Sequence, residues 1–275
     1  RLNNFSFWIL PFAFTLLLST FFMDGGGPAG GWTLYPPLSL QMGEGFPFMI
    51  FAIHLAGISS IMGSINIVLT ILNMRAPGMS LMRMPIFTWM ALVVQFLLLF
   101  AIPIITVALF LLMFQRTFDA TFFTVEAGAD PLLWQHLFWI FGHPEVYIII
   151  LPAFGAISEI IPTFSRKPLF GYNSLVGAMI AIMCIGMVVW AHHQYTVGMS
   201  MGAVTYFMIG TIIISIPVGL MIFNFIATMW RGSMTFETVP RWHRQMHRLE
   251  LPGNVLEAVA DFATQVFQGA ADVFG

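Results

Sequence analysis

Long apolar runs separated by short polar or glycine- and proline-rich stretches make up most of the chain. A helix that crosses the hydrocarbon core of a bilayer needs about 20 mainly apolar residues. Six runs are long enough, at residues 5–23, 46–73, 85–114, 132–162, 170–191 and 201–230. Turn-forming residues fall between them. The pattern therefore predicts an all-α, polytopic membrane bundle of six transmembrane helices.

Composition supports a lipid environment. The 275 residues are 59% hydrophobic and 8% charged, whereas a soluble domain carries about 25% charged residues. The formal net charge of −2 gives no support for a nucleic-acid partner. The single cysteine, Cys184, excludes an internal disulfide framework and any cysteine-based zinc or iron–sulfur site.

Lysine and arginine residues are distributed unevenly over the connecting loops, and this bias predicts the orientation of the bundle. Nine of the ten fall in alternate loops: Arg1, Arg75, Arg83, Arg166, Lys167, Arg231, Arg241, Arg244 and Arg248. Arg116 is the only basic residue on the other side. Basic loops favour the cytoplasmic side of a membrane, so we expect both termini on that side.

The last part of the chain, residues 239–275, has a different pattern from the membrane part, residues 1–238. It begins with the basic stretch RWHRQMHRLE and continues with apolar residues at helical spacing. Such a segment is typical of a helix that lies on a membrane surface or docks on a partner. His243 and His247 are four residues apart, so they either bind a metal or form an exposed basic helix end.

Ionisable side chains interrupt two of the apolar runs. Residues 139–150 read WIFGHPEVYIII, which contains His143, Glu145 and Tyr147. Such residues are costly inside a membrane and are functional candidates. His143 and Tyr147 are four apart and share a helix face. Glu145 lies about 200° around the helix from His143 and points elsewhere. Glu145 is either a proton-exchanging acid or a neutral, hydrogen-bonded acid without a transport role.

The next apolar run ends in a pair of histidines, His192 and His193. In a regular helix they would diverge by about 100°, but they can converge on one ion if the chain turns there. Together with His143 they would offer three neutral imidazoles, which suit copper, zinc or iron. A set without thiolates and with an open position suits a metal that binds a small molecule. The alternative is that these histidines only pack and form hydrogen bonds.

These motifs resemble those of one family. The stretches WIFGHPEVYIIILP and WAHHQYTVGM resemble subunit I of the haem–copper oxidases, the cytochrome c oxidase family. The resemblance covers residues 1–238 and includes RLNNFSFWILP, GWTLYPPLS and HLAGISSIMGSINIVLTILNMRAPGM. It implies that the six predicted helices are the third to eighth spans of the twelve-helix fold of that subunit.

The resemblance implies a role for individual residues. His143, His192 and His193 would be the ligands of the copper called CuB. Tyr147 would be linked covalently to the first of them and would supply an electron and a proton. Glu145 would be the branch-point acid of the proton path called the D channel. Further residues would line proton paths, namely Asn3 or Asn4, Ser59, Ser60, Asn66 and, near the mouth of the K channel, Ser158. Trp139 and Trp190 would pack near the oxygen-reducing site.

The sequence departs from the family pattern at two kinds of position. The family's haem ligands lie on the second and tenth spans, so we expect no haem axial ligand in this chain. His54 and His136 match family histidines that do not bind haem iron. Val218 and Met221 stand where the family's K channel has threonine and lysine. Because their side chains cannot relay protons, we expect either another proton path or different chemistry.

The function implied is that of a portion of a terminal respiratory oxidase. The enzyme would reduce oxygen to water at a haem–CuB centre with electrons from cytochrome c, coupled to proton translocation. Copper and haem would be its cofactors, and subunits II and III its partners in a bacterial inner or mitochondrial inner membrane. Quinol is the alternative donor. The alternative function is a truncated or diverged non-catalytic membrane fragment, or a split half that needs other chains.

Overall fold

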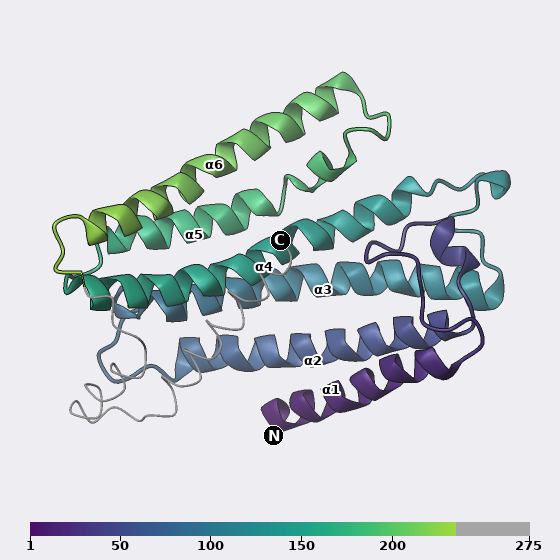
Figure 1. Ribbon diagram of the computed structural model, residues 1–275, viewed down its shortest axis with the longest axis horizontal. Helices are drawn as coiled ribbons and strands as arrows, with labels where there is room; N and C mark the ends of the chain where they lie inside the picture. Colours follow the sequence, from purple (N-terminus) through teal and green to yellow (C-terminus); the bar gives the residue numbers. More distant parts are fainter. Residues whose placement is uncertain (235–275) are drawn as a thin grey trace.

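The computed structural model describes residues 1–234, and all the regular secondary structure in this part of the chain is helical (Figure 1). It contains six α-helices: α1 (Leu2–Ser19), α2 (Gly45–Asn73), α3 (Ile86–Phe118), α4 (Leu132–Ser165), α5 (Tyr172–Gly186) and α6 (Met201–Met229). Short 3-10 helices lie in the connections: η1 (Thr20–Phe22), η2 (Leu38–Gln41), η3 (Leu81–Arg83), η4 (Val125–Ala127) and η5 (Trp190–Gln194). The predicted all-α polytopic bundle is confirmed. The predicted tail at 239–275, with His243 and His247, lies outside the described residues.

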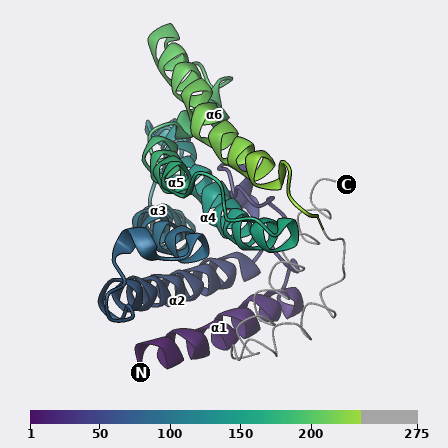
Figure 2. The same ribbon diagram turned by 90° about the vertical axis from the view of Figure 1, so that its left-hand side faces the viewer.

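Helices that follow one another in sequence lie side by side, from α1 at one edge of the bundle to α6 at the other (Figures 1 and 2). Helix α4 is central, because it packs against α3, α5, α6 and η5. Its buried residues include Trp139, Gly142 and His143. The part of this helix that carries His143 is therefore covered by other parts of the same chain.

Within residues 1–234, five helices are long and apolar enough to cross a membrane, namely α1 extended through η1, α2, α3, α4 and α6. The fifth of the six predicted spans, 170–191, differs from the expectation. The apolar run at 170–191 forms an α-helix of 15 residues that ends at Gly186, and the chain continues as η5. A Cβ atom at position 186 would lie 2.9 Å from Cε2 of Tyr147. The glycine therefore lets the end of α5 approach α4 closely.

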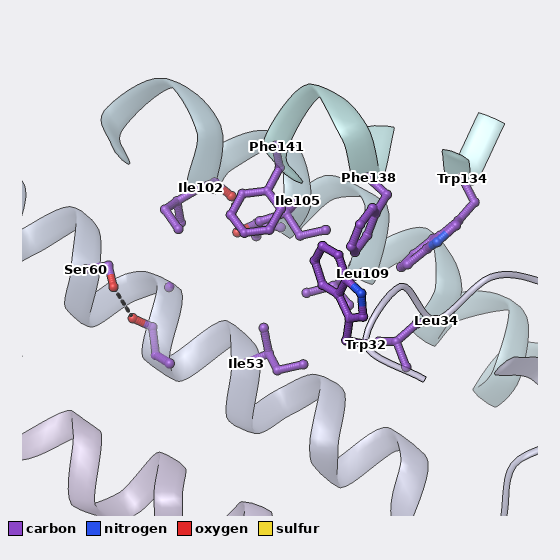
Figure 3. A pocket seen from close by; sticks show the side chains of 13 residues that line it. Trp32, Leu34, Ile53, Ser60, Ile102, Ile105, Leu109, Trp134, Phe138 and Phe141 are labelled. Carbon is purple, nitrogen blue, oxygen red and sulfur yellow. Dashed lines mark hydrogen bonds between the residues drawn. The ribbon is translucent and has the colours of Figure 1, made fainter. Parts of the chain in front are cut away.

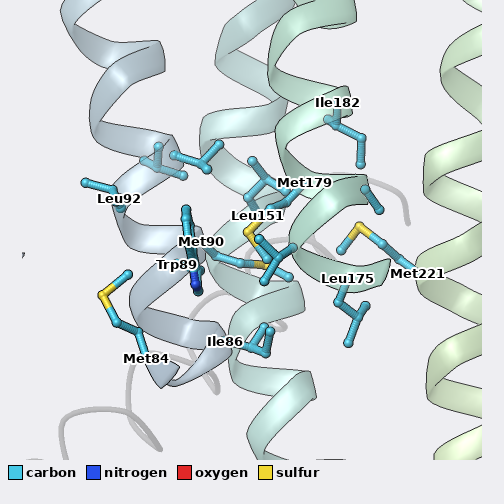
Figure 4. Packing of buried hydrophobic residues seen from close by; sticks show 14 of the residues in the cluster. Met84, Ile86, Trp89, Met90, Leu92, Leu151, Leu175, Met179, Ile182 and Met221 are labelled. Atoms are coloured by element: carbon cyan, nitrogen blue, oxygen red, sulfur yellow. The ribbon is translucent and has the colours of Figure 1, made fainter. Parts of the chain in front are cut away.

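Two apolar clusters hold the helices together. The first lies between α3, α4, α5 and α6, and the fully buried residues at its centre are Met90, Leu97, Leu151, Leu175, Met179 and Met221 (Figure 4). The second joins α2, α3 and α4 to the long α1–α2 loop and includes Phe46, Ile50, Leu112, Phe123, Trp134 and Phe138. Since lipid is as apolar as these side chains, close packing provides the attraction.

Candidate metal centre

Three histidines from two segments meet beside the middle of α4. His143 lies on α4, and His192 and His193 lie on η5. One ring nitrogen from each lies within 4.8 Å of the others. Nδ1 of His143 is 3.4 Å from Nε2 of His193, which is 3.1 Å from Nε2 of His192. His143 is buried, His192 is half-buried and His193 is exposed. The structure therefore brings together the three histidines that the sequence singled out.

The turn after α5 makes this convergence possible. The α-helix ends at Gly186, and η5 packs against α4. Trp190 fastens η5 there, because its Nε1 donates a hydrogen bond of 3.4 Å to Nδ1 of His136 on α4. The Trp190 ring also meets Phe207 of α6 edge to face. The turn that the sequence predicted near residue 191 is present, and it directs both neighbouring histidines toward His143.

The ring of His192 is oriented by Thr211, on α6, which the sequence analysis did not single out. Nδ1 of His192 lies 2.9 Å from Oγ1 of Thr211. The Thr211 hydroxyl donates its one proton to the Phe207 carbonyl at 2.7 Å, so Oγ1 accepts from the His192 Nδ1–H. The lone pair of His192 is then on Nε2, which faces the other two histidines. Thr211 lies in an apolar run, and its hydroxyl group was the one feature of the sequence that could have marked it as part of the site.

The ring of His193 lies against an indole. Trp139, one turn before His143 on α4, stacks on His193 with ring centroids 3.7 Å apart and an interplanar angle of 6°. Its Nε1 donates a hydrogen bond to the hydroxyl of Tyr35, in the α1–α2 loop. Trp139 is buried. The structure thus places Trp139 directly on one of the three histidines, and a third segment of the chain holds that indole.

Tyr147 lies next to the buried face of His143. The two rings meet at 77° with centroids 4.9 Å apart, which follows from their i, i+4 spacing on α4. Nε2 of His143 is buried and has no hydrogen-bond partner among the residues that the structure describes. The other side of the Tyr147 ring rests on Gly186. The pair is therefore fixed between α4 and the end of α5.

Glu145 is half-buried on α4, and it is not one of the three grouped metal-ligand candidates. One turn before it, Phe141 lines a cavity of about 220 Å³ between α2, α3 and α4 (Figure 3). Most of the lining is apolar, and Ser60 of α2 is one of its few polar residues. The cavity lies between the first turns of α4 and the middle of α2.

Four of the polar residues predicted for a proton path meet where α1 and α2 pack together. Asn3, Asn4, Ser59 and Ser60 line one groove of about 480 Å³. Ser59 Oγ donates to the Ser6 carbonyl across the two helices at 2.6 Å. Ser60 belongs both to this groove and to the cavity in Figure 3. The residues lining the groove do not include the other two predicted positions, Asn66 and Ser158.

Val218 and Met221, which stand at the K-channel positions of the family, lie in an apolar environment. Met221 is fully buried in the cluster that contains Leu175 and Met179 (Figure 4). Val218 and Tyr147 pack against the same cluster. The buried hydroxyl of Ser158 donates to the Phe154 carbonyl of its own helix at 2.7 Å. The side of Tyr147 that faces this cluster is therefore in contact with hydrocarbon and thioether groups.

Comparisons with known proteins point to one family. The family model described as cytochrome c and quinol oxidase polypeptide I matches residues 1–243. The chain is 48% identical over 247 residues to cytochrome c oxidase subunit 1 of Cereibacter sphaeroides, covering 88% of this chain and 44% of that protein. It is 50% identical over 244 residues to quinol oxidase subunit 1 of Bacillus subtilis (strain 168), covering 88% and 37%. The chain spans less than half the length of these relatives.

Proposed function

This chain belongs to the cytochrome c and quinol oxidase polypeptide I family, and from that membership we propose that it is a portion of a terminal respiratory oxidase whose three histidines hold copper. The family consists of terminal oxidases, which are oxidoreductases. The observation that carries the proposal is the convergence of one ring nitrogen each from His143, His192 and His193. Copper there would be CuB, the redox-active ion at which oxygen is reduced.

The donor set fits a copper ion. Imidazole nitrogens suit copper, and the Thr211 contact leaves the lone pair of His192 on the nitrogen that faces the cluster. A ligating histidine commonly donates its second N–H to such an acceptor, which fixes the tautomer and the ring orientation. The indole ring of Trp139 stacks on the imidazole ring of His193 and limits its rotation. These neighbours support a binding role over a purely packing role for the three histidines.

The haem would take its axial ligands from outside the described residues. Nδ1 of His54 lies 2.8 Å from the Ile50 carbonyl, and its Nε2 lies 3.2 Å from the Thr106 carbonyl. Each ring nitrogen of His54 therefore faces a backbone carbonyl oxygen rather than an open space in which an iron could bind. His136 accepts from Trp190 at Nδ1. These contacts support the expectation that neither histidine is a haem ligand.

The protons would reach the site from the α1–α2 side. The polar groove lined by Asn3, Asn4 and Ser59 meets the cavity beside Phe141 at Ser60, and Glu145 follows Phe141 by one turn. In this role Glu145 accepts and releases the protons used at the metal site. The apolar packing of Met221 against α5 disfavours a second supply along α6, because thioether and hydrocarbon groups donate no protons.

The electron donor that we propose is cytochrome c, delivered through other subunits such as subunits II and III. Quinol is the second candidate, and the name of the Bacillus subtilis relative favours it. The membrane would be a bacterial inner membrane or the mitochondrial inner membrane. A second candidate function is a non-catalytic membrane fragment, or a split half that needs other chains. It is supported by Val218 and Met221, whose side chains cannot relay protons.

Copper analysis of the purified chain in lipid nanodiscs tests the proposal. We expect one copper per chain, lost in His143→Ala and retained in the matched control His54→Gln, whose histidine lies outside the cluster. Nitrogen hyperfine structure in the electron paramagnetic resonance spectrum should identify imidazole ligands. Copper that binds only after coexpression with the remaining oxidase segments would favour the split half. Equal copper in the wild type and His143→Ala would overturn the assignment of the site.

A further inference from the structure

Arg116, in the last turn of α3, clamps the loop that joins α1 and α2. One guanidinium nitrogen, Nη1, donates to the Leu40 carbonyl at 3.1 Å, and Nη2 donates to the Met42 carbonyl at 2.6 Å. Leu40 lies within η2, and Met42 is the residue that follows it. The planar guanidinium holds two acceptors in a fixed relation, which a flexible ammonium group does less well.

The clamped segment is continuous with Tyr35. The backbone N–H of Ser39 donates to the Tyr35 carbonyl at 3.1 Å, and that of Leu40 donates to the Pro37 carbonyl at 3.2 Å. Two prolines follow Tyr35 and fix their own φ angles. Residues 35–42 therefore form one stiff turn, and a shift at the Met42 end is passed on to Tyr35.

Tyr35 is in turn connected to a predicted metal ligand. Its hydroxyl accepts the hydrogen bond from Nε1 of Trp139, and the Trp139 ring lies flat on His193. Trp32, from the same loop, meets Trp139 edge to face at 5.6 Å. The opposite edge of the indole passes close to Gly142, where an added Cβ would lie 3.0 Å from Cε3 of Trp139. The indole can therefore move little unless the loop moves.

We propose that Arg116 is a positioning residue that sets the ring plane of His193 by way of the 35–42 turn, Tyr35 and Trp139. The part of this inference that concerns a metal ligand rests on the proposed function, whereas the coupling from Arg116 to Trp139 does not. Arg116 touches none of the three histidines in the contacts above, so its effect on them is transmitted through the loop.

The same loop offers a matched control. Trp134, also on α4, donates from Nε1 to the Thr33 carbonyl at 2.9 Å. This bond fastens the loop before Tyr35 and bypasses the turn that Arg116 holds. Trp134→Phe removes one loop hydrogen bond, as a general loosening would, without releasing residues 40–42. A specific role for Arg116 therefore predicts different results for the two variants.

The first test needs no copper. The indole N–H resonance of Trp139 is followed by ¹H–¹⁵N spectroscopy of the full chain in nanodiscs, with the assignment taken from Trp139→Phe. We expect Arg116→Gln to shift this resonance more than Trp134→Phe does, and Arg116→Lys to leave it between the wild-type and Arg116→Gln positions. In the Tyr35→Phe background, adding Arg116→Gln should cause no further shift, because the link is already broken. An unchanged resonance in Arg116→Gln, or additive shifts, would overturn the inference.

The second test uses the copper-loaded chain. We expect Arg116→Gln and Tyr35→Phe to change the copper hyperfine splitting in the same direction at unchanged copper stoichiometry. An unchanged splitting would refute the effect on His193. If the wild-type chain binds no copper, the proposed function fails for this chain alone, while the Trp139 resonance still decides whether Arg116 acts through the loop.

Discussion

Thr211 and His192 form a direct link between α6 and the turn that carries two of the three clustered histidines, with 2.9 Å between Oγ1 and Nδ1. The contact determines which nitrogen of His192 is free to bind a metal. It also explains how a hydroxyl in an apolar helix contributes to the site, because its own proton is already donated to the Phe207 carbonyl.

Thr211→Val is therefore expected to weaken copper binding. Loss of such an outer hydrogen bond typically costs about 10–100-fold in metal affinity, and isothermal titration with a competing chelator measures it. Thr205→Val is the matched control, since within residues 1–234 the Thr205 hydroxyl bonds only to the Met201 carbonyl on the same helix. Equal affinities of the Thr211 and Thr205 variants would show that the contact does not hold His192.

Gly186→Ala is expected to displace Tyr147 and destabilise the bundle. The new methyl group would lie 2.9 Å from Cε2 and 3.0 Å from Cδ2 of Tyr147, and overpacking of this kind costs about 1–3 kcal/mol. Thermal unfolding in nanodiscs, followed by circular dichroism, reports the change. Gly177→Ala on the same helix is the control, because a Cβ there meets nothing within 4 Å. The prediction is wrong if both variants unfold at the same temperature.

Met221→Lys is expected to destabilise the cluster between α4, α5 and α6. Met221 is fully buried among apolar side chains, and a buried charge without a partner costs several kcal/mol. Met221→Leu should change the free energy of unfolding by less than about 1.5 kcal/mol, because the two side chains have similar volumes. Denaturation in mixed micelles compares them. Full stability of Met221→Lys would indicate a hydrated path beside Tyr147 and would argue against proton supply from the α1–α2 side alone.

Glu145→Gln is expected to slow oxygen reduction when this chain is assembled with the remaining oxidase subunits. The amide keeps the size of the side chain but cannot exchange protons, and a lost proton-transfer group typically costs about 100-fold or more in rate. An oxygen electrode measures the rate. Glu159→Gln serves as the control, because Glu159 lies on the same helix but is exposed. An undiminished rate in Glu145→Gln would remove Glu145 from the proposed proton path.

The length of the apolar runs predicted most of the helices well, because it is a local property of the chain. The predicted runs at 132–162 and 46–73 lie close to α4 (Leu132–Ser165) and α2 (Gly45–Asn73). The 15-residue length of α5 did not follow from its apolar run, which continues to residue 191, whereas the helix ends at Gly186, close to Tyr147 on α4. The proximity of His143 and Tyr147 could be predicted in the same way, because their i, i+4 spacing places them on one face of a single helix.

By itself, the sequence determined the all-α membrane class, the family motifs and the proximity of His143 to Tyr147. Only the tertiary structure decided that His192 and His193 both reach His143, that Thr211 orients one of them, and that Trp139 stacks on the other. These contacts join residues 19 to about 50 positions apart. They depend on how η5 packs between α4 and α6, which no local periodicity encodes.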